Sequence, residues 1–166
     1  MLHRKTIDLI TKDIREKDEL GVPVTLDDLV NLIESLGGKC YAGKIETDSK
    51  LRLTKKSELP LFAITYKKAL NEKLQRFVIA EELGHLVLHM LRENGELKES
   101  DYSYTPAGNI EARHFAASLL MPEEDFRRIA KLYSSGETTN LTRIANFFDT
   151  TIQATQVRGT ALGLWK

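Results

Sequence analysis

The sequence predicts an α+β fold, with helices at both ends of the chain and a small β-sheet between them. Three observations predict it. Apolar residues recur at helical spacing before residue 39, short β-type runs occupy residues 39–66, and helical spacing returns after residue 70. The 166 residues suit one domain, or a core with a small appendage.

Two helices are expected before the strands. Gly21 and Pro23 end the first, because neither residue continues a helix well. Thr25 is a good N-cap for the second, and Asp28 stands where a capping box requires an acceptor. The glycine pair at 37–38 ends this second helix.

The middle of the chain carries three short β-type runs. Residues 44–46 and 51–53 alternate between apolar and polar side chains, and residues 61–66 are rich in β-branched and aromatic types. These runs predict three strands.

The remainder of the chain is predicted to be mostly helical. Asn71 can cap a long helix over residues 72–90, and a polar loop with Gly, Pro and Tyr follows over residues 91–108. Four further helices are expected, at residues 110–121, 123–133, 141–148 and 152–162.

Composition narrows the class of function. Lys plus Arg and Asp plus Glu number 24 each, so the net charge of zero disfavours nucleic acid as a direct main partner. The chain has no run long enough for a membrane span and no secretory segment, and Cys40 is its single cysteine. A cytoplasmic protein that does not enter the membrane is therefore expected.

The long helix carries the string EELGH at residues 81–85. In the HExxH signature, two histidines one helical turn apart bind zinc, and the glutamate after the first histidine acts as the general base. In this frame Glu82 is the candidate catalytic base and His85 the candidate second metal ligand. Glu81 stands in the place of the first histidine.

Longer strings around this motif resemble the ImmA/IrrE family. RFVIAEELGHLVLH at residues 76–89 and EARHFAASLLMP at residues 111–122 are similar to that family's two motif blocks, and residues 141–165 resemble its closing helices. The resemblance implies a zincin-like metallopeptidase fold, with residues 1–133 as the core. It places residues 134–166 in a C-terminal helical subdomain that resembles a helix-turn-helix and packs on the core.

The resemblance also implies a ligand set of two histidines and one glutamate for zinc. Aligning the second block puts that glutamate's position at Asn109, so His85 is the one ligand of the three that this chain keeps. Glu111 lies two residues later, about 200° around a helix, and is not expected at the same metal. His114 falls at a variable position and is expected at the surface, and His89 is expected to pack between helices.

Two states of the altered site are plausible. In one, no metal is bound: Glu81 accepts a hydrogen bond from the Asn109 amide and pairs with protonated His85. In the other, Glu81, His85 and the Asn109 carbonyl hold a divalent ion weakly, and manganese or magnesium suits these donors better than zinc. The first state is favoured, which leaves open whether the protein is an enzyme.

The family resemblance implies a protein partner, a helix-turn-helix repressor that family members cleave or antagonise. One alternative is an active metallopeptidase with a non-standard metal site. Another is a DNA-binding regulator that reads bases with Gln153, Gln156 and Arg158 of its C-terminal helices. The loop around Tyr102 and Tyr104 could be a contact surface or a flap over the altered site.

Overall fold

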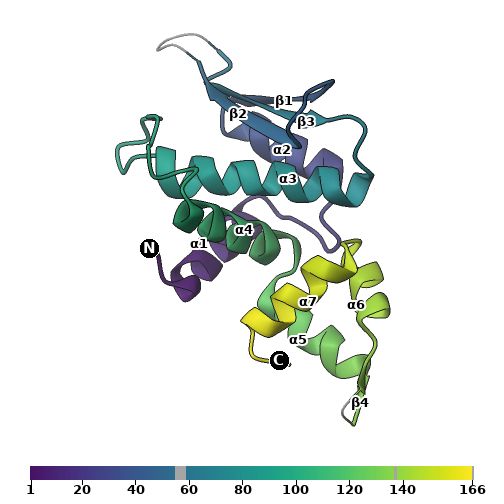
Figure 1. Cartoon of the computed structure of the whole chain (residues 1–166). Helices are drawn as coiled ribbons and strands as arrows, with labels where there is room; N and C mark the ends of the chain where they lie inside the picture. The colour runs from purple at the N-terminus through teal and green to yellow at the C-terminus, as the bar shows by residue number, and fades with distance from the viewer. Residues whose placement is uncertain (55–58, 137, 166) are drawn as a thin grey trace.

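The computed structural model describes residues 1–54, 59–136 and 138–165. Within these residues the chain forms seven α-helices and a three-stranded sheet, in the order helices, sheet, helices, and the sheet lies at one end of the molecule against α2 and α3 (Figure 1). The α+β prediction is confirmed. No helix in this part of the chain is long and apolar enough to cross a membrane.

Two N-terminal helices precede the sheet, α1 at Arg4–Lys17 and α2 at Leu26–Ser35. The predicted capping box of α2 is present, because Thr25 accepts from the Asp28 amide while Asp28 accepts from the Thr25 amide. Gly37 ends the helix with a φ of 83°, in the left-handed region that glycine adopts without strain.

The sheet consists of β1 at Gly38–Gly43, β2 at Ser49–Leu53 and β3 at Phe62–Lys67, in the order β1-β3-β2. The predicted strand at 44–46 is wrong, since these residues belong to the connection between β1 and β2. β1 runs parallel to β3 and β2 antiparallel to it, so the chain must cross the end of β3 and reverse here. β1 ends at Gly43, where its pairing with β3 ends. The alternation of apolar and polar side chains over residues 44–46 does not indicate this limit, because it depends on a distant strand.

The predicted long helix is α3 at Glu72–His85, extended by one π-helical turn at Leu86–Met90. It lies beside α4 at Pro106–Leu120, which begins four residues earlier than expected (Figure 1). The two backbones approach closely at Gly84, where a Cβ atom would lie 2.9 Å from the carbonyl oxygen of Ala112. A larger residue there would push α4 away from the motif helix.

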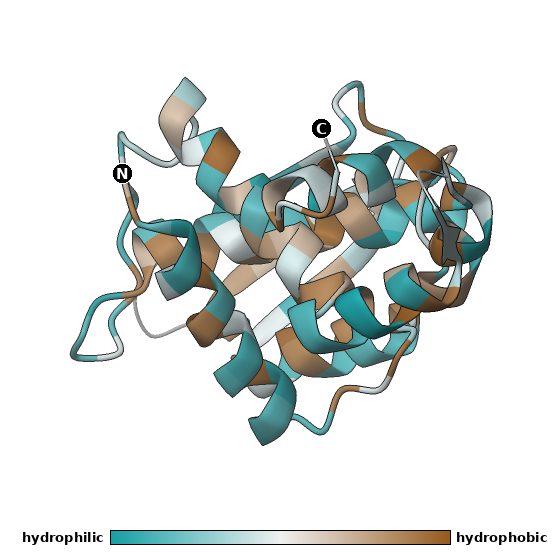
Figure 2. Cartoon of the chain, turned by 90° about the horizontal axis from the view of Figure 1, so that it is seen from below, coloured by the Kyte–Doolittle hydropathy of each residue, from teal (hydrophilic) through white to brown (hydrophobic). Residues whose placement is uncertain are grey.

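The C-terminal part is formed by α5 at Glu123–Leu132, a short hairpin, and two further helices. The hairpin pairs β4 at Ser134–Ser135 with β5 at Thr138–Thr139, and α6 at Leu141–Phe148 and α7 at Ile152–Ala161 follow it. Helices seen from below carry both hydrophobic and hydrophilic residues, as expected of helices with one buried face (Figure 2). The division at residue 134 stays a prediction.

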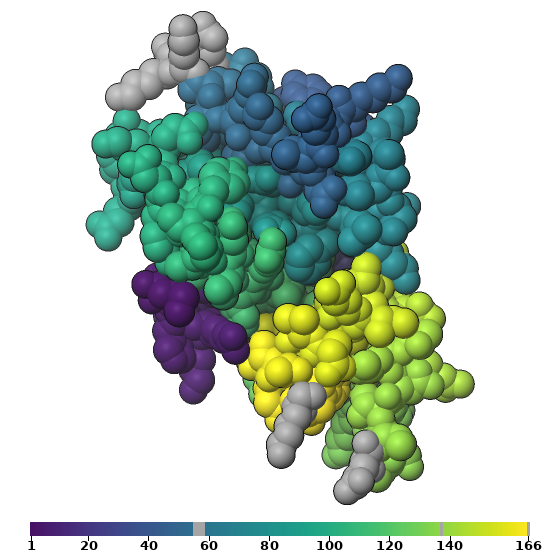
Figure 3. Space-filling model, in the orientation of Figure 1, coloured from purple at the N-terminus to yellow at the C-terminus, as the bar shows by residue number. Residues whose placement is uncertain are grey.

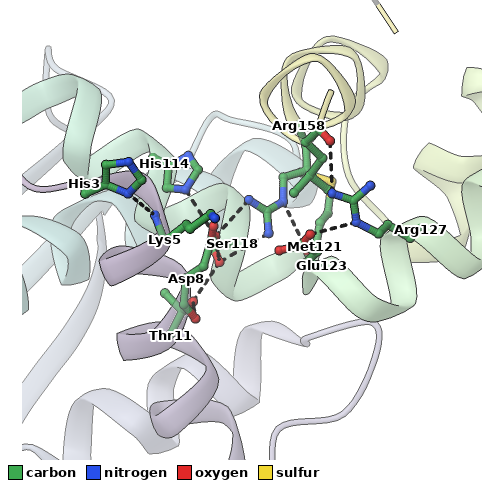
Figure 4. Close-up of polar contacts among 11 residues, drawn as sticks. His3, Lys5, Asp8, Thr11, His114, Ser118, Met121, Glu123, Arg127 and Arg158 are labelled. Atoms are coloured by element: carbon green, nitrogen blue, oxygen red, sulfur yellow. Dashed lines mark hydrogen bonds and ion pairs between the residues drawn. The ribbon is translucent and has the colours of Figure 1, made fainter. Parts of the chain in front are cut away.

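A buried polar network ties α7 to α1 and α4 (Figure 4). The Asp8 carboxylate accepts hydrogen bonds from Ser118 at 2.6 Å and from Arg158 at 3.1 Å, and it lies 3.2 Å from the His114 ring. We call these four residues the Asp8 network. Its geometry corrects two expectations: the His114 side chain is only 8% exposed instead of lying on the surface, and Arg158 is fully buried and cannot reach a DNA base.

Candidate functional site

The motif residues lie where α3, its π-helical turn, β2 and the loop 91–105 meet α4. α3 supplies Glu82 and His85, the π-helical turn supplies His89, and α4 supplies Glu111. Ser103 of the loop lies between the two histidines. We call these five residues the histidine cluster; all are at least 94% buried.

Glu82, the candidate general base, is held by two hydroxyl groups. Ser49 of β2 donates to its Oε1 at 2.8 Å, and Tyr104 of the loop donates to its Oε2 at 2.9 Å. Burial raises the pKa of Glu82, while these two hydrogen bonds lower it and the nearby Glu81 charge adds to the rise; the net pKa lies above the ordinary value. Both carboxylate oxygens already have a protein donor.

His85 is oriented through its Nδ1 atom, which lies 3.0 Å from the Ser103 hydroxyl. Burial and the neighbouring His89 lower the pKa of His85 to about 4, so its ring is neutral at physiological pH. The Tyr104 ring packs against it with centroids 4.4 Å apart. Nε2 has no hydrogen-bond partner among the described residues, and it retains contact with solvent, since every fully buried side-chain nitrogen or oxygen there has a partner.

His89 and Glu111 form a second buried pair in the histidine cluster, 3.0 Å apart. The other Glu111 oxygen accepts from the Tyr102 hydroxyl at 3.0 Å and from the Leu2 amide. Burial raises the pKa of Glu111, but these hydrogen bonds outweigh it and bring the pKa below the ordinary value. Glu111 therefore serves to hold His89, the loop and the N-terminus together.

Glu81 and Asn109 do not form the expected pair. Glu81 instead receives a hydrogen bond from Arg113 of α4, with Nε and Oε1 3.1 Å apart. No hydrogen bond of the described residues joins the Asn109 side chain to Glu81 or His85. The expected ion pair between Glu81 and protonated His85 is wrong as well, because the His85 ring turns to Ser103 and is neutral.

These side chains do not fit a zinc ion. A zinc site needs three protein ligands that converge, with a fourth position left for water. In the described ranges no group of three or more His, Cys, Asp or Glu residues is placed to hold a metal. His85 has a free Nε2, but Glu81 is turned to Arg113.

Three residues that contact the motif were missed as site residues: Ser49, Ser103 and Tyr104. Ser49 and Ser103 belong to no recognisable sequence motif, and only the folding of β2 and of the loop brings them to Glu82 and His85. For Tyr104 a signal existed, since the aromatic loop suggested a flap. The loop does fold onto the motif, with Tyr104 against His85 and Tyr102 edge-on to His89 at 5.2 Å.

Comparison with known proteins shows which family the chain matches. A profile of the IrrE N-terminal-like domain, peptidase family M78, matches residues 46–160, well over half of the chain. The chain belongs to this family. M78 is a family of zinc metallopeptidases, and the match includes the EELGH string and the second motif block. A search of curated proteins gave no significant match.

Proposed function

We propose that this M78 protein acts on a helix-turn-helix repressor by binding it, with zinc-dependent proteolysis lost or impaired. The observation that carries the proposal is the Glu81–Arg113 ion pair at the family's first ligand position. An arginine at this carboxylate supplies the positive charge that a metal would otherwise bring. The cytoplasmic location expected from the sequence is part of the proposal.

The hydrogen bonds of Glu82 also support lost or impaired proteolysis. In zinc peptidases the ion lowers the pKa of its bound water towards neutrality, and the glutamate takes the proton. Here both Glu82 oxygens accept from the hydroxyls of Ser49 and Tyr104. Without a metal ion to lower the pKa of a bound water, Glu82 has no acidified water from which to take a proton.

A second candidate function is hydrolysis at a non-standard metal site. The observation in its favour is the Nε2 atom of His85, which has no protein partner and keeps contact with solvent. Binding would require Glu81 to leave Arg113 and the Asn109 carbonyl to turn inward, and the oxygen donors would suit manganese or magnesium.

Metal analysis separates these two candidates. We expect the protein purified without chelator or added metal to hold far less than one equivalent of zinc, manganese or magnesium by plasma mass spectrometry. Restoring the family ligands in the Glu81→His, Asn109→Glu double variant should raise zinc affinity at least about tenfold. A stoichiometric metal in the unmodified protein, lost in both Glu81→Ala and His85→Ala, would sink the proposal.

The partner is tested with a panel of purified helix-turn-helix repressors from the same genome, each bound to its labelled operator. We expect the chain to release one repressor from DNA, measured by fluorescence anisotropy, while mass spectrometry finds that repressor intact. Glu82→Gln should release it equally well, because no bond is cut. Cleavage of the repressor, abolished by Glu82→Gln, would establish proteolysis instead.

A further inference from the structure

An apolar groove lies between α3, α4 and α7, and none of the residues of the histidine cluster lines it. Its volume is about 450 Å³. The apolar side chains that line it include Phe77 and Leu74 of α3, Ile110 of α4 and Val157 of α7. Ile110 and Val157 are 53% and 60% exposed, so this apolar surface is open to solvent. Figure 3 shows the face on which α4, α7 and the N-terminal residues meet.

The charged side chains around this groove are basic. Arg4, Arg113, His114 and Arg158 line it, and none of its lining residues is acidic. Asp8 forms an ion pair with Arg158 and lies 3.2 Å from the His114 ring, as Figure 4 shows, and Arg113 contacts Glu81. Arg4 has no ion-pair partner among the described residues. The free charge at the rim is therefore positive, in a chain whose net charge is zero.

The shape of the groove favours a helix as its occupant. All three walls are helices, so no strand edge is available to add an extended peptide by main-chain hydrogen bonds. An amphipathic helix places apolar residues at i, i+3, i+4 and i+7 into such a groove, and its outer side chains meet the rim. Exposed apolar patches with a polar rim mark sites of protein–protein contact.

We propose that the α3–α4–α7 groove binds an acidic amphipathic helix of a partner protein. Leucine-type side chains of the partner cover Val157, Ile110 and Leu74, and its carboxylates approach Arg4. Charge complementarity speeds encounter and selects against basic helices. The inference goes beyond the function proposed above and needs neither metal nor general base.

The test uses a synthetic 15-residue helical peptide, with leucine at the four groove-facing positions and glutamate on the flanks, labelled with fluorescein. A matched peptide carries lysine in place of each glutamate. We expect the acidic peptide to bind the full chain at least tenfold more tightly than the basic one in anisotropy titrations. Added salt should weaken it, since the rim charges are exposed.

Variants locate the binding on the molecule. Val157→Glu should weaken binding of the acidic peptide at least tenfold, whereas Leu132→Glu, which alters a leucine 65% exposed on α5 outside the groove, should leave it unchanged. Arg4→Glu should reduce the preference for the acidic peptide over the basic one. Thermal unfolding shows whether each variant is folded, and Ile110→Glu replaces Val157→Glu if that variant is not.

Four results would overturn the inference: equal binding of both peptides, no binding of either, unchanged binding in both groove variants, or a groove covered by self-association. The last would appear in sedimentation as a concentration-dependent dimer that Val157→Glu dissociates. Metal content and repressor release do not involve the peptide, so failure of this inference and failure of the proposed function are separate results.

Discussion

The Asp8 network and the histidine cluster both bury carboxylates and histidines against α4, but they balance charge differently. In the Asp8 network a permanently charged guanidinium, that of the fully buried Arg158, faces the carboxylate. Burial raises the pKa of Asp8, but His114, Ser118 and Arg158 together hold that pKa well below its usual range. This network is an ion pair with full hydrogen bonding, which suits a role in joining α1, α4 and α7.

The histidine cluster has no such cation. Glu82 receives only neutral hydroxyl donors, and its pKa is raised mainly by burial. His85 is buried in its neutral form. Burial thus shifts the pKa values of Glu82 and His85, the residues predicted as base and ligand, towards their neutral forms, whereas the Asp8 carboxylate is held in its charged form. Removing a charge from the Asp8 network should therefore lower the free energy of unfolding, whereas removing the Glu82 charge from the histidine cluster should raise it.

The largest effect is expected from Arg158→Ala. The change leaves the Asp8 carboxylate without its guanidinium and empties a fully buried side-chain position. The free energy of unfolding should fall by about 3 kcal/mol or more, as when one partner of a buried pair is removed. Urea denaturation followed by circular dichroism measures it.

Arg127→Ala is the matched control. Arg127 forms an ion pair with Glu123 four residues earlier, and both side chains are about half exposed. Its loss should cost less than about 1 kcal/mol. Equal losses in the two variants would mean that the Asp8 network has no special role in stability.

The pH dependence of stability should separate the two clusters. The pKa of His85 is about 4 in the folded protein, against an ordinary value of about 6.5, so only the unfolded chain takes up this proton between those values. Stability should fall as the pH drops from about 6.5 to 4. The Asp8 contribution is fully present above its ordinary pKa of about 4 and is lost only below it.

His85→Gln should therefore reduce the change of the unfolding free energy between pH 6.5 and 4. The slope should fall by an amount that corresponds to the uptake of at most one proton on unfolding. Asp8→Asn should flatten it only below about pH 4. Unfolding free energies from urea titrations at half-unit pH steps give both slopes. A wild-type slope between pH 6.5 and 4 that survives in His85→Gln would show that another group titrates there.

Local rules in the sequence predicted much of the fold. The Thr25–Asp28 capping box, the strand near residues 62–67 and the helical segment 72–90 all depend on neighbours within a few residues. The strand at 38–43 was missed because its limits are set by pairing with β3, about 24 residues away along the chain.

The site shows the same division between local and distant contacts. The EELGH spacing predicted Glu82 and His85 as site residues. The fold buries both side chains, and Ser103 and Tyr104 of the loop contact them. The partner of Glu81 could not be predicted, because Arg113 is 32 residues away and the helical phase of α4 decides whether Asn109 or Arg113 faces it. Tyr104 reaches Glu82 only through the path of the loop.

The smallest effect, opposite in sign, is expected from Glu82→Gln. Because the folded pKa of Glu82 is raised, its ionisation costs stability once the pH is above the ordinary glutamate value of about 4.3. Glutamine keeps the shape and can still accept from Tyr104, but it carries no charge. At pH 7 the variant should be more stable by about 1 kcal/mol, and the gain should vanish below about pH 4.

Glu124→Gln provides the control, because Glu124 is exposed on α5 and should give no gain at any pH. Thermal and urea unfolding of the three proteins at pH 7 and pH 4 would measure the difference. A loss of stability in Glu82→Gln at pH 7 would mean that the Ser49 and Tyr104 hydroxyls compensate the buried charge in full. The histidine cluster would then be as well balanced as the Asp8 network, and the contrast between a stabilising network and a retained site would fail.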